Sequence, residues 1–325
     1  MTEVYRTFHG KILLFGEYTI ITGSKALVIP LKQFSGRLAY PVSEINNPDI
    51  MTSRRSLNAF FEYLSNMQES SRTDLEKVTR GDEDRGLIDL ERLGEELERG
   101  LFFRSSIPQE YGAGSSAALV AAIYDAFASN KINYNSERTE DMLMLRQIFS
   151  KMESHFHGTS SGIDPVCCYT GKTIFQDGVT LYTTEIQHLP ESCKFFLADS
   201  GEKGETEPHV EGFNKRLSTD LAFTHVIEDE MTDMVNHCIH LLITGSMSYF
   251  AEALLKLSRL QLEHFDPMIP DPIRQFWIEG LQKEIFTLKL CGSGGGGFFL
   301  GYTDDPEATS MTFKQAGKKI SMLDL

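Results

Sequence analysis

The most informative stretch of this 325-residue chain is Pro108-Gln109-Glu110-Tyr111-Gly112-Ala113-Gly114-Ser115-Ser116-Ala117-Ala118. It runs into the apolar, alanine-rich segment 119–127, which is typical of a buried helix. Serine is a preferred N-cap residue, so we expect Ser115 or Ser116 to cap this helix. Glycines let backbone N–H groups approach an anion, and a helix N-terminus adds positive partial charge. The stretch therefore predicts a phosphate-binding loop.

Two common nucleotide-binding motifs do not fit this loop. The only Gly-Lys-Thr of the chain is Gly171-Lys172-Thr173, and Val166 stands where a Walker loop needs its first glycine. A dinucleotide fingerprint fails because Ala117 occupies the position of its third glycine. For the loop taken alone, a helix start with close packing remains the alternative.

A second glycine-rich run, Gly292–Gly297, lies between the strand-like segments 286–290 and 298–302. Five glycines in six positions cost backbone entropy, which is justified where another group must approach the chain. A simple hairpin tip is the alternative. Lys11 is equally unusual, because it begins the apolar strand candidate 11–15 and must point to solvent or into a polar cavity.

Glu153 and Asp164 are candidate catalytic carboxylates. Glu153 falls near the end of the amphipathic helix 141–155, which leads into the turn-forming stretch 157–165, where Asp164 follows a tight turn. If the turn folds Asp164 back, one carboxylate can hold Mg²⁺ while the other accepts a proton from a hydroxyl. Solvated or capping carboxylates, and a structural role for His157, are the alternatives.

The rest of the chain mixes helices and strands without strict alternation, which predicts an α+β protein of two lobes. The segments 11–15 and 26–31 are expected to form a hairpin, as are 173–176 and 179–183. Helices are expected over 56–68, 210–217, 222–264 and 273–284, and a solvated loop and helix over 71–100. A restart of the pattern after Pro190 suggests domains 1–190 and 191–325.

Composition excludes several classes of function. The chain has 31 basic and 46 acidic residues and a net charge of −15, which disfavours nucleic acid and anionic membranes as partners. No stretch approaches the roughly 20 apolar residues of a membrane span. The five cysteines show no zinc-ligand spacing, and we expect reduced, mostly buried thiols in a cytoplasmic protein.

Four segments together resemble the GHMP kinase superfamily, named for galactokinase, homoserine kinase, mevalonate kinase and phosphomevalonate kinase. The first family motif is similar to residues 10–17, the phosphate loop to 108–118 and the glycine-rich C-terminal motif to 291–297. The stretch 157–164 is similar to the mevalonate kinase segment before the catalytic aspartate, and Glu153 stands eleven residues before Asp164, as in mevalonate kinases.

The resemblance implies a role for each matching residue. Asp164 matches the general base that accepts the hydroxyl proton, and Lys11 matches the lysine that contacts this aspartate and the substrate oxygen. Glu153 and Ser116 match magnesium ligands. The loop matching the ATP-binding site consists of Gly112, Ala113, Gly114, Ser115, Ser116 and Ala117. Positions matching the substrate side are Glu17, Tyr18, His157, Thr206, Gly294 and Gly295.

The sequence departs from the family pattern at several of these positions. Tyr18 replaces the histidine of typical mevalonate kinases, which concerns the acceptor because that position lies beside the substrate in relatives. Ser160 replaces the usual proline. His9, Ala113 and Ser293 replace Pro, Leu and Ala, and none of the changes removes a catalytic side chain.

The resemblance implies the two-lobed GHMP kinase fold, with a ribosomal-protein-S5-like N-terminal domain and a ferredoxin-like α/β sandwich C-terminal domain. It implies transfer of the γ-phosphoryl group of ATP, with Mg²⁺, to an alcohol, and mevalonate is the best acceptor. Phosphomevalonate or another small alcohol is the alternative, as is a GHMP-fold protein that binds a ligand without turnover. Diphosphomevalonate decarboxylase and galactokinase fit the motifs less well. A homodimer is expected by analogy.

Overall fold

The computed structural model describes residues 5–42, 47–75, 87–204 and 206–325, without the side chains of 70–75, 206 and 207. Its contacts define two compact units. Unit 1 comprises Met1–Lys11, Pro30–Pro108 and Gly114–Lys172. Unit 2 comprises Ile12–Ile29, Gln109–Ala113 and Thr173–Leu325. The domain boundary near residue 190 stays a prediction about separate folding domains.

Two long strands run through both units: β1 (Phe8–Phe15) and β2 (Ala26–Ala39). The order of their sheet is β1-β2-β4-β5, where β4 is Thr173–Asp177 and β5 is Thr180–Thr184, and β3 (Phe102–Ser105) also pairs with β2. The β2–β3 pairing is antiparallel, with Leu38 opposite Phe103. The β2–β4 pairing is also antiparallel, with Leu27 opposite Phe175. The two strands expected to form the first hairpin are neighbours in this sheet.

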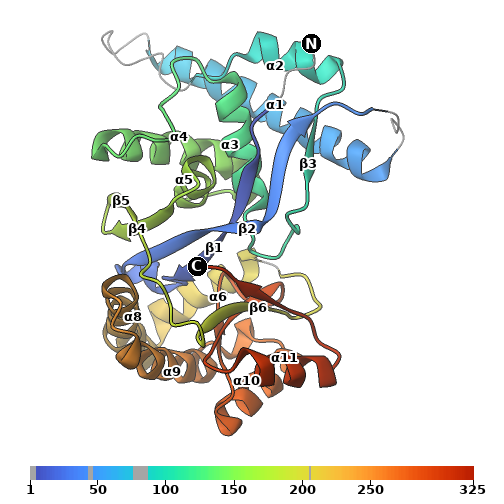
Figure 1. The fold of residues 1–325 in the computed structure, drawn as a ribbon. Helices are drawn as coiled ribbons and strands as arrows, with labels where there is room; N and C mark the ends of the chain where they lie inside the picture. The colour runs from blue at the N-terminus through green and yellow to red at the C-terminus, as the bar shows by residue number, and fades with distance from the viewer. Residues whose placement is uncertain (1–4, 43–46, 76–86, 205) are drawn as a thin grey trace. The chain divides into compact units, whose positions relative to one another are not determined.

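The described residues of unit 1 form five helices beside these strands: α1 (Pro48–Leu75), α2 (Leu90–Glu98), α3 (Ser115–Phe127), α4 (Thr139–His157) and α5 (Ile163–Thr170). Figure 1 shows α3, α4 and α5 lying together. Their shared core contains three aromatic rings in edge-to-face geometry, with the Tyr124 centroid 5.0 Å from Phe149 and 5.2 Å from Tyr169. Such pairs add specific geometry to the burial of large apolar surfaces. This packing fixes α5, which carries Asp164, against α3 and α4.

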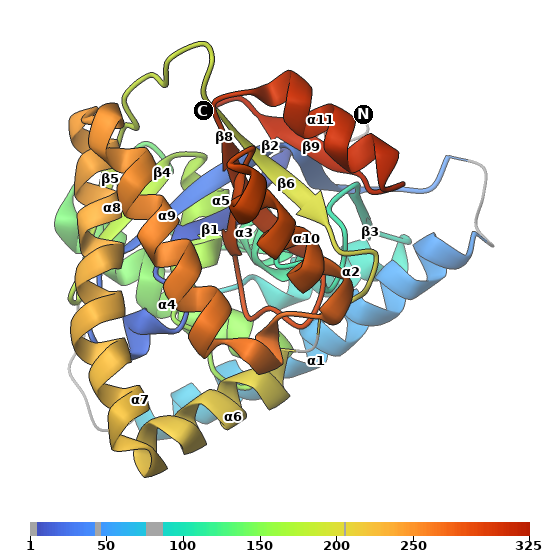
Figure 2. The ribbon, with the colours of Figure 1, turned by 90° about the horizontal axis from the view of Figure 1, so that it is seen from below.

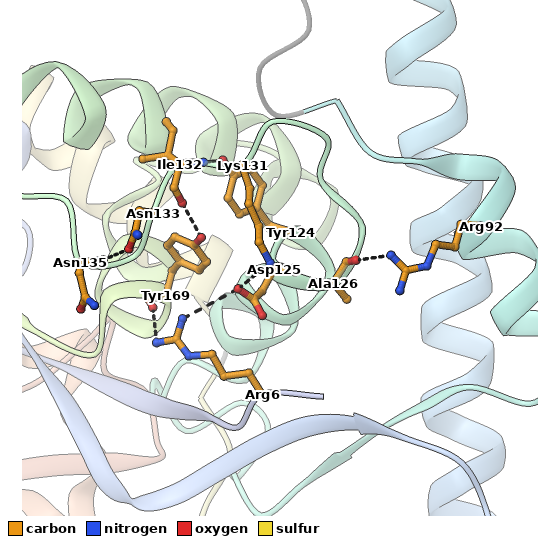
Figure 3. A network of polar contacts seen from close by, with 10 residues as sticks. All are labelled: Arg6, Arg92, Tyr124, Asp125, Ala126, Lys131, Ile132, Asn133, Asn135 and Tyr169. Carbon is orange, nitrogen blue, oxygen red and sulfur yellow. Dashed lines mark hydrogen bonds and ion pairs between the residues drawn. The ribbon is translucent and has the colours of Figure 1, made fainter. Parts of the chain in front are cut away.

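A polar network continues from this aromatic core (Figure 3). The Arg6 guanidinium donates to the Tyr169 carbonyl at 2.9 Å and stacks on the Tyr134 ring at 3.8 Å. The Tyr169 hydroxyl donates to the carbonyl of Ile132 at 2.6 Å, and the Tyr124 hydroxyl accepts from the amide of the same residue at 3.0 Å. The loop between α3 and α4 is therefore bonded to the C-terminal end of α5.

Unit 2 contains the remaining strands and helices. Its strands are β4 (Thr173–Asp177), β5 (Thr180–Thr184), β6 (Lys194–Asp199), β7 (Thr287–Leu290), β8 (Phe298–Thr303) and β9 (Ile320–Leu323). Its helices are α6 (Thr206–Thr219), α7 (Leu221–His225), α8 (Thr232–Thr244), α9 (Met247–His264), α10 (Asp271–Lys283) and α11 (Pro306–Gln315). Short turns are the 3-10 helices Thr19–Thr22 and Asp266–Met268 and the π-helix Val226–Met231.

The second sheet is antiparallel with the order β7-β8-β6-β9, and it is covered by helices on both faces. Adjacent residues of β6 point to opposite faces, because side chains alternate along a strand. Phe195 lies 5.8 Å from Phe250 of α9, whereas Phe196 lies 5.5 Å from Phe313 of α11. Figure 2 shows α8 and α9 side by side, in agreement with their contacts.

Most predicted elements are confirmed, and three expectations are wrong. Gly114, not Ser115 or Ser116, caps α3, because the backbone there takes a left-handed conformation and the serines lie inside the first turn. The turn expected to extend through Asp164 ends earlier, since α5 begins at Ile163. The helix expected over 222–264 is interrupted by the π-helix and by Gly245, whose φ is +74°.

Two expectations about the chain as a whole also have outcomes. All five cysteines are free thiols, and four of them are buried. None of the helices in the described ranges is both long enough and apolar enough to cross a bilayer. Part of the charged segment 71–100 falls on residues 76–86, outside the described residues, and α2 forms its C-terminal part.

Candidate active site

The centre of the candidate site in unit 1 is an ion pair between Lys11 and Asp164. The Lys11 Nζ lies 2.6 Å from the Asp164 Oδ2. Strand β1 supplies the lysine, which is only 6% exposed, and the first turn of α5 supplies the aspartate. Burial works to lower the pKa of Lys11, but the Asp164 carboxylate, with help from Glu153, outweighs burial and raises it. The lysine is therefore held charged beside the carboxylate predicted to act as the base.

Gly114 explains how the loop and the lysine fit together. Its φ is +80°, and a Cβ at this position would lie 2.7 Å from the Lys11 Cγ. A contact that short requires a shift, so only glycine fits here without displacing the lysine stem. The N-terminus of α3 thus starts directly against the catalytic lysine candidate.

Glu153 is the second carboxylate of the unit 1 cluster, and it is buried. Its Oε1 accepts from the Ser116 hydroxyl at 3.4 Å, and its Oε2 accepts a short hydrogen bond from the Ser160 hydroxyl. Burial, followed by the charge of Asp164, raises the pKa of Glu153 to about 8. Hydrogen bonds from the two serines and the charge of Lys11 act in the opposite direction.

Ser160 is a residue whose role sequence reasoning missed. Besides donating to Glu153, its hydroxyl accepts from the Gly162 amide at 3.0 Å, and its carbonyl accepts from Ser150 at 2.5 Å. A proline, which the family pattern favours here, has no hydroxyl for either contact. The serine at position 160 was visible in the sequence as a departure from the family pattern. Its hydrogen-bond partner, Glu153, became apparent only in the structure, where the turn packs against α4.

His157 lies at the C-terminal end of α4 on the same side as Ser116. Its Nε2 is 3.0 Å from the Ser116 Oγ, and the ring tautomer decides which atom donates. Burial, opposed by the charge of Asp164, lowers the pKa of His157. The imidazole is therefore neutral near pH 7 and can accept a hydrogen bond from the serine.

The donor chemistry of this cluster fits Mg²⁺. Mg²⁺ prefers oxygen ligands and is usually bound by one or two carboxylates together with substrate phosphates. Glu153 and Ser116 supply a carboxylate and a hydroxyl within 3.4 Å of each other, and the raised pKa marks a buried carboxylate that a cation would stabilise. Within the described ranges no group of three His, Cys, Asp or Glu residues is arranged as a metal cluster. A Mg²⁺ ion that is also bound by substrate phosphates needs only one or two protein ligands, so it does not require such a cluster.

In unit 2, Glu17 forms a buried ion pair that the sequence did not reveal. Its Oε1 lies 2.6 Å from the Nζ of Lys289, and both side chains are 1% exposed. Lys289 also donates to the carbonyl of Leu290. Like Lys11, Lys289 is a lysine in an apolar strand, which was the available signal, but its partner is 272 residues away. Glu17 is thus engaged by the protein itself.

The other substrate-side positions of unit 2 have different environments. Tyr18 is 6% exposed, and its hydroxyl donates to the carbonyl of Ser293 at 2.5 Å. Gly294 and Gly295 have φ values of +73° and +76° in the loop between β7 and β8. Thr206 begins α6, and its side chain lies outside the described residues.

The predicted residues fall into two sets, one in each unit. The set in unit 1 consists of Lys11, Gly114, Ser116, Glu153, His157 and Asp164, joined by direct contacts and by the charges of Lys11 and Asp164 acting on Glu153. Ser115 and Ala117 lie in the first turn of α3. Gly112 and Ala113 precede this turn and belong to unit 2, as do Glu17, Tyr18, Thr206, Gly294 and Gly295.

Part of the chain matches a known family model. Residues 86–172 match the family model of the GHMP kinases N terminal domain. Among curated proteins, none matches the sequence.

Three solved structures show the extent of the fold similarity. L. major mevalonate kinase in complex with R-mevalonate is 16% identical, covers 96% of this chain and 91% of its own, and has a TM-score of 0.61. Streptococcus pneumoniae phosphomevalonate kinase in complex with phosphomevalonate and AMPPNP is 14% identical, with 99% and 100% coverage and a TM-score of 0.61. Lactococcus lactis galactokinase complexed with galactose is 15% identical, with 99% and 93% coverage and a TM-score of 0.60.

These findings define the class of the protein as a two-domain α+β chain of the GHMP kinase fold. More particularly, residues 86–172 match the GHMP kinases N terminal domain, and the chain shares its fold with mevalonate kinase structures over nearly its whole length.

Proposed function

We propose that this protein is an ATP-dependent kinase that phosphorylates the hydroxyl of a small anionic alcohol, with mevalonate as the best acceptor. The observation that carries the proposal is the 2.6 Å ion pair of Lys11 and Asp164 beside the buried Glu153. Phosphoryl transfer depends on positioning and charge stabilisation more than on covalent chemistry by the enzyme. The unit 1 cluster supplies a base, a fixed cation and oxygen ligands.

In the proposed reaction, Asp164 accepts the proton of the acceptor hydroxyl. The acceptor oxygen bonds to the γ-phosphorus of ATP, and the bond between that phosphorus and the oxygen of the leaving ADP breaks. The Lys11 ammonium stabilises the negative charge that develops on the acceptor oxygen. Backbone N–H groups of Gly112–Ala117 are proposed to bind the ATP phosphates. Mg²⁺, held by Ser116 and Glu153, would neutralise phosphate charge when bound.

Mevalonate as the acceptor rests on the motif resemblance, not on the fold comparison. The mevalonate kinase and phosphomevalonate kinase structures have the same TM-score of 0.61 to this chain. The spacing of eleven residues between Glu153 and Asp164 and the stretch 157–164 favour the mevalonate kinase pattern. Phosphomevalonate is therefore the first alternative acceptor to test.

The test is a coupled ADP-release assay with Mg-ATP, in which mevalonate, phosphomevalonate, homoserine and galactose are offered separately. We expect turnover of mevalonate, and we expect Asp164→Asn to lower kcat by about 10²- to 10⁴-fold, the usual contribution of a general base. Asp164→Asn should still bind Mg-ATP, which isothermal titration calorimetry can measure. If only another acceptor is turned over, that compound replaces mevalonate as the assigned substrate. If ATP binds tightly but no acceptor is turned over, the protein is better described as a non-catalytic binding protein.

A further inference from the structure

Tyr18 has a backbone conformation that a bulky residue rarely adopts. Its φ is +63° and its ψ is −45°. Such a conformation is strained for a residue with a Cβ and persists only where the surrounding structure imposes it. Strain of this kind indicates that the position of the Tyr18 side chain matters.

Three contacts of unit 2 hold the Tyr18 side chain in place. Its ring centroid lies 4.7 Å from that of Phe213 and 5.2 Å from that of Phe265. Its hydroxyl donates to the Ser293 carbonyl at 2.5 Å. Burial, together with the charge of Glu17, raises the pKa of Tyr18 well above its usual range, so the hydroxyl remains a donor. The hydroxyl is thus committed to the protein backbone.

The ion pair of the preceding residue strengthens the same connection. Glu17 binds Lys289 at 2.6 Å, and Lys289 lies on β7, shortly before the glycine-rich loop. Two consecutive residues after β1 therefore bind the strand β7 and the loop that follows it. Breaking one partner of a buried ion pair is strongly destabilising, so this attachment is firm.

The rest of the loop Gly292–Gly297 is attached through its backbone. The Gly295 amide donates to the carbonyl of Met268 at 2.7 Å, and the Gly297 amide donates to the carbonyl of Glu202 at 2.7 Å. A Cβ at Gly295 would lie 2.0 Å from the His209 Nε2, so the absence of side chains lets neighbours approach. The Tyr18 hydroxyl donates from a side chain to the backbone near the beginning of this loop.

We propose that Tyr18 is a positioning residue for the glycine-rich loop Gly292–Gly297 and does not contact the substrate. This assignment differs from the one that the resemblance implies for the same position. A side chain that is 6% exposed, packed between two phenylalanines and bonded through its only polar atom has no surface left to recognise an acceptor. The kinetic consequence rests on the proposed kinase function, whereas the structural consequence does not.

The structural test is hydrogen exchange of the full-length protein without ligands, followed by mass spectrometry. Tyr18→Phe keeps the ring and removes only the hydroxyl, so it should fold. We expect the amides of Gly292–Gly297 to exchange about fivefold faster, as expected for the loss of one hydrogen bond. Tyr249→Phe is the matched control, because Tyr249 is 67% exposed on α9 of the same unit, and it should leave this exchange unchanged.

The kinetic test compares kcat and KM of the same variants with each acceptor that the wild type turns over. A positioning role lowers kcat/KM for different acceptors by a similar factor and is accompanied by faster exchange of the loop. Unchanged exchange, or a change in KM for one acceptor alone, would overturn the proposal. A wild type that turns over no acceptor would contradict the proposed function, and the exchange measurement would still decide the role of Tyr18.

Discussion

Glu153 is a buried carboxylate near a second carboxylate, Asp164. Its pKa therefore differs between the folded and the unfolded chain, and the stability of the protein depends on pH. Its pKa is raised from 4.5 to about 8 in the folded protein. Between these two values the folded protein holds a proton that the unfolded chain has released. The free energy of unfolding should therefore fall as the pH rises from about 5 to 8, with a limiting slope of about 1.4 kcal/mol per pH unit.

Glu153→Gln should remove most of this slope, because glutamine does not titrate. The measurement is urea denaturation at several pH values between 5 and 8, with a chelator present to keep cations from Glu153. Glu211→Gln, at an exposed position of α6, should retain the wild-type slope. Equal slopes for the wild type and Glu153→Gln would show that Glu153 is ionised over the whole range.

At the level of residues, sequence reasoning succeeded where a residue type was out of place for its own segment. A lysine in an apolar strand and an aspartate after a glycine-rich turn pointed to Lys11 and Asp164, which the structure places 2.6 Å apart. It missed Lys289 and Ser160 as partners of carboxylates, and it did not anticipate the bond of Tyr18 to Ser293. That bond joins residues 275 positions apart, and nothing in either local sequence specifies it.

The N-terminus of α3 depends on the absence of a side chain at Gly114. Gly114→Ala combines an unfavourable left-handed φ with a Cβ only 2.7 Å from Lys11. Gly171, the C-cap of α5, offers a matched position, since its φ is +67° and nothing lies within 4 Å of a Cβ there. We expect Gly171→Ala to cost about 1 kcal/mol of unfolding free energy, and Gly114→Ala at least about twice as much.

The two variants should also differ in activity. Gly114→Ala displaces the Lys11 stem and should lower kcat in the ADP-release assay, whereas Gly171→Ala should leave kcat unchanged. Thermal and urea denaturation give the stability difference between them. If both variants lose the same stability and keep full activity, the contact between the α3 N-terminus and Lys11 does not contribute to catalysis.

Element types were predictable wherever the pattern was local. The Ala-rich segment of α3 and the alternating strands β4 and β5 follow from their own composition and turns. The N-cap of α3 was not predictable, because the need for glycine at position 114 comes from Lys11, which lies on β1 and not in the same segment. The same holds for α5, where proline, aspartate and glycine indicated a turn, but packing against α3 and α4 made a helix of it.

For the whole molecule, the shared strands predict cooperative unfolding. β1 and β2 each have residues in both units, so neither unit can lose its strands without disrupting the other. The single tryptophan, Trp277, is fully buried in unit 2 and reports on that unit alone, whereas far-UV circular dichroism reports on both. We expect thermal transitions from the two signals to have coincident midpoints. A fluorescence transition well separated from the dichroism transition would contradict this expectation.

The fold class itself was predictable because four motifs lie in order along nearly the whole chain. The α+β architecture is confirmed, although the three solved structures compared with it are only 14–16% identical. The composition of the two units was not predictable, since segments such as Gln109–Ala113 leave one unit and join the other for a few residues. Periodicity reports which face of a segment is buried but not which partner covers it.

The π-helix Val226–Met231 has a consequence for comparing this chain with its distant relatives. A π turn holds an additional residue, and a single-residue insertion into an α-helix is the simplest origin of such a turn. Ignoring it in an alignment would shift every following position of α8 by one and rotate its assigned face by about 100°. Asn236, which accepts from the Lys25 amide at 2.8 Å, would then be equated with buried core positions such as Val235. Against a relative whose helix is a continuous α-helix here, a one-residue gap within 226–231 would keep the buried face of α8 in register.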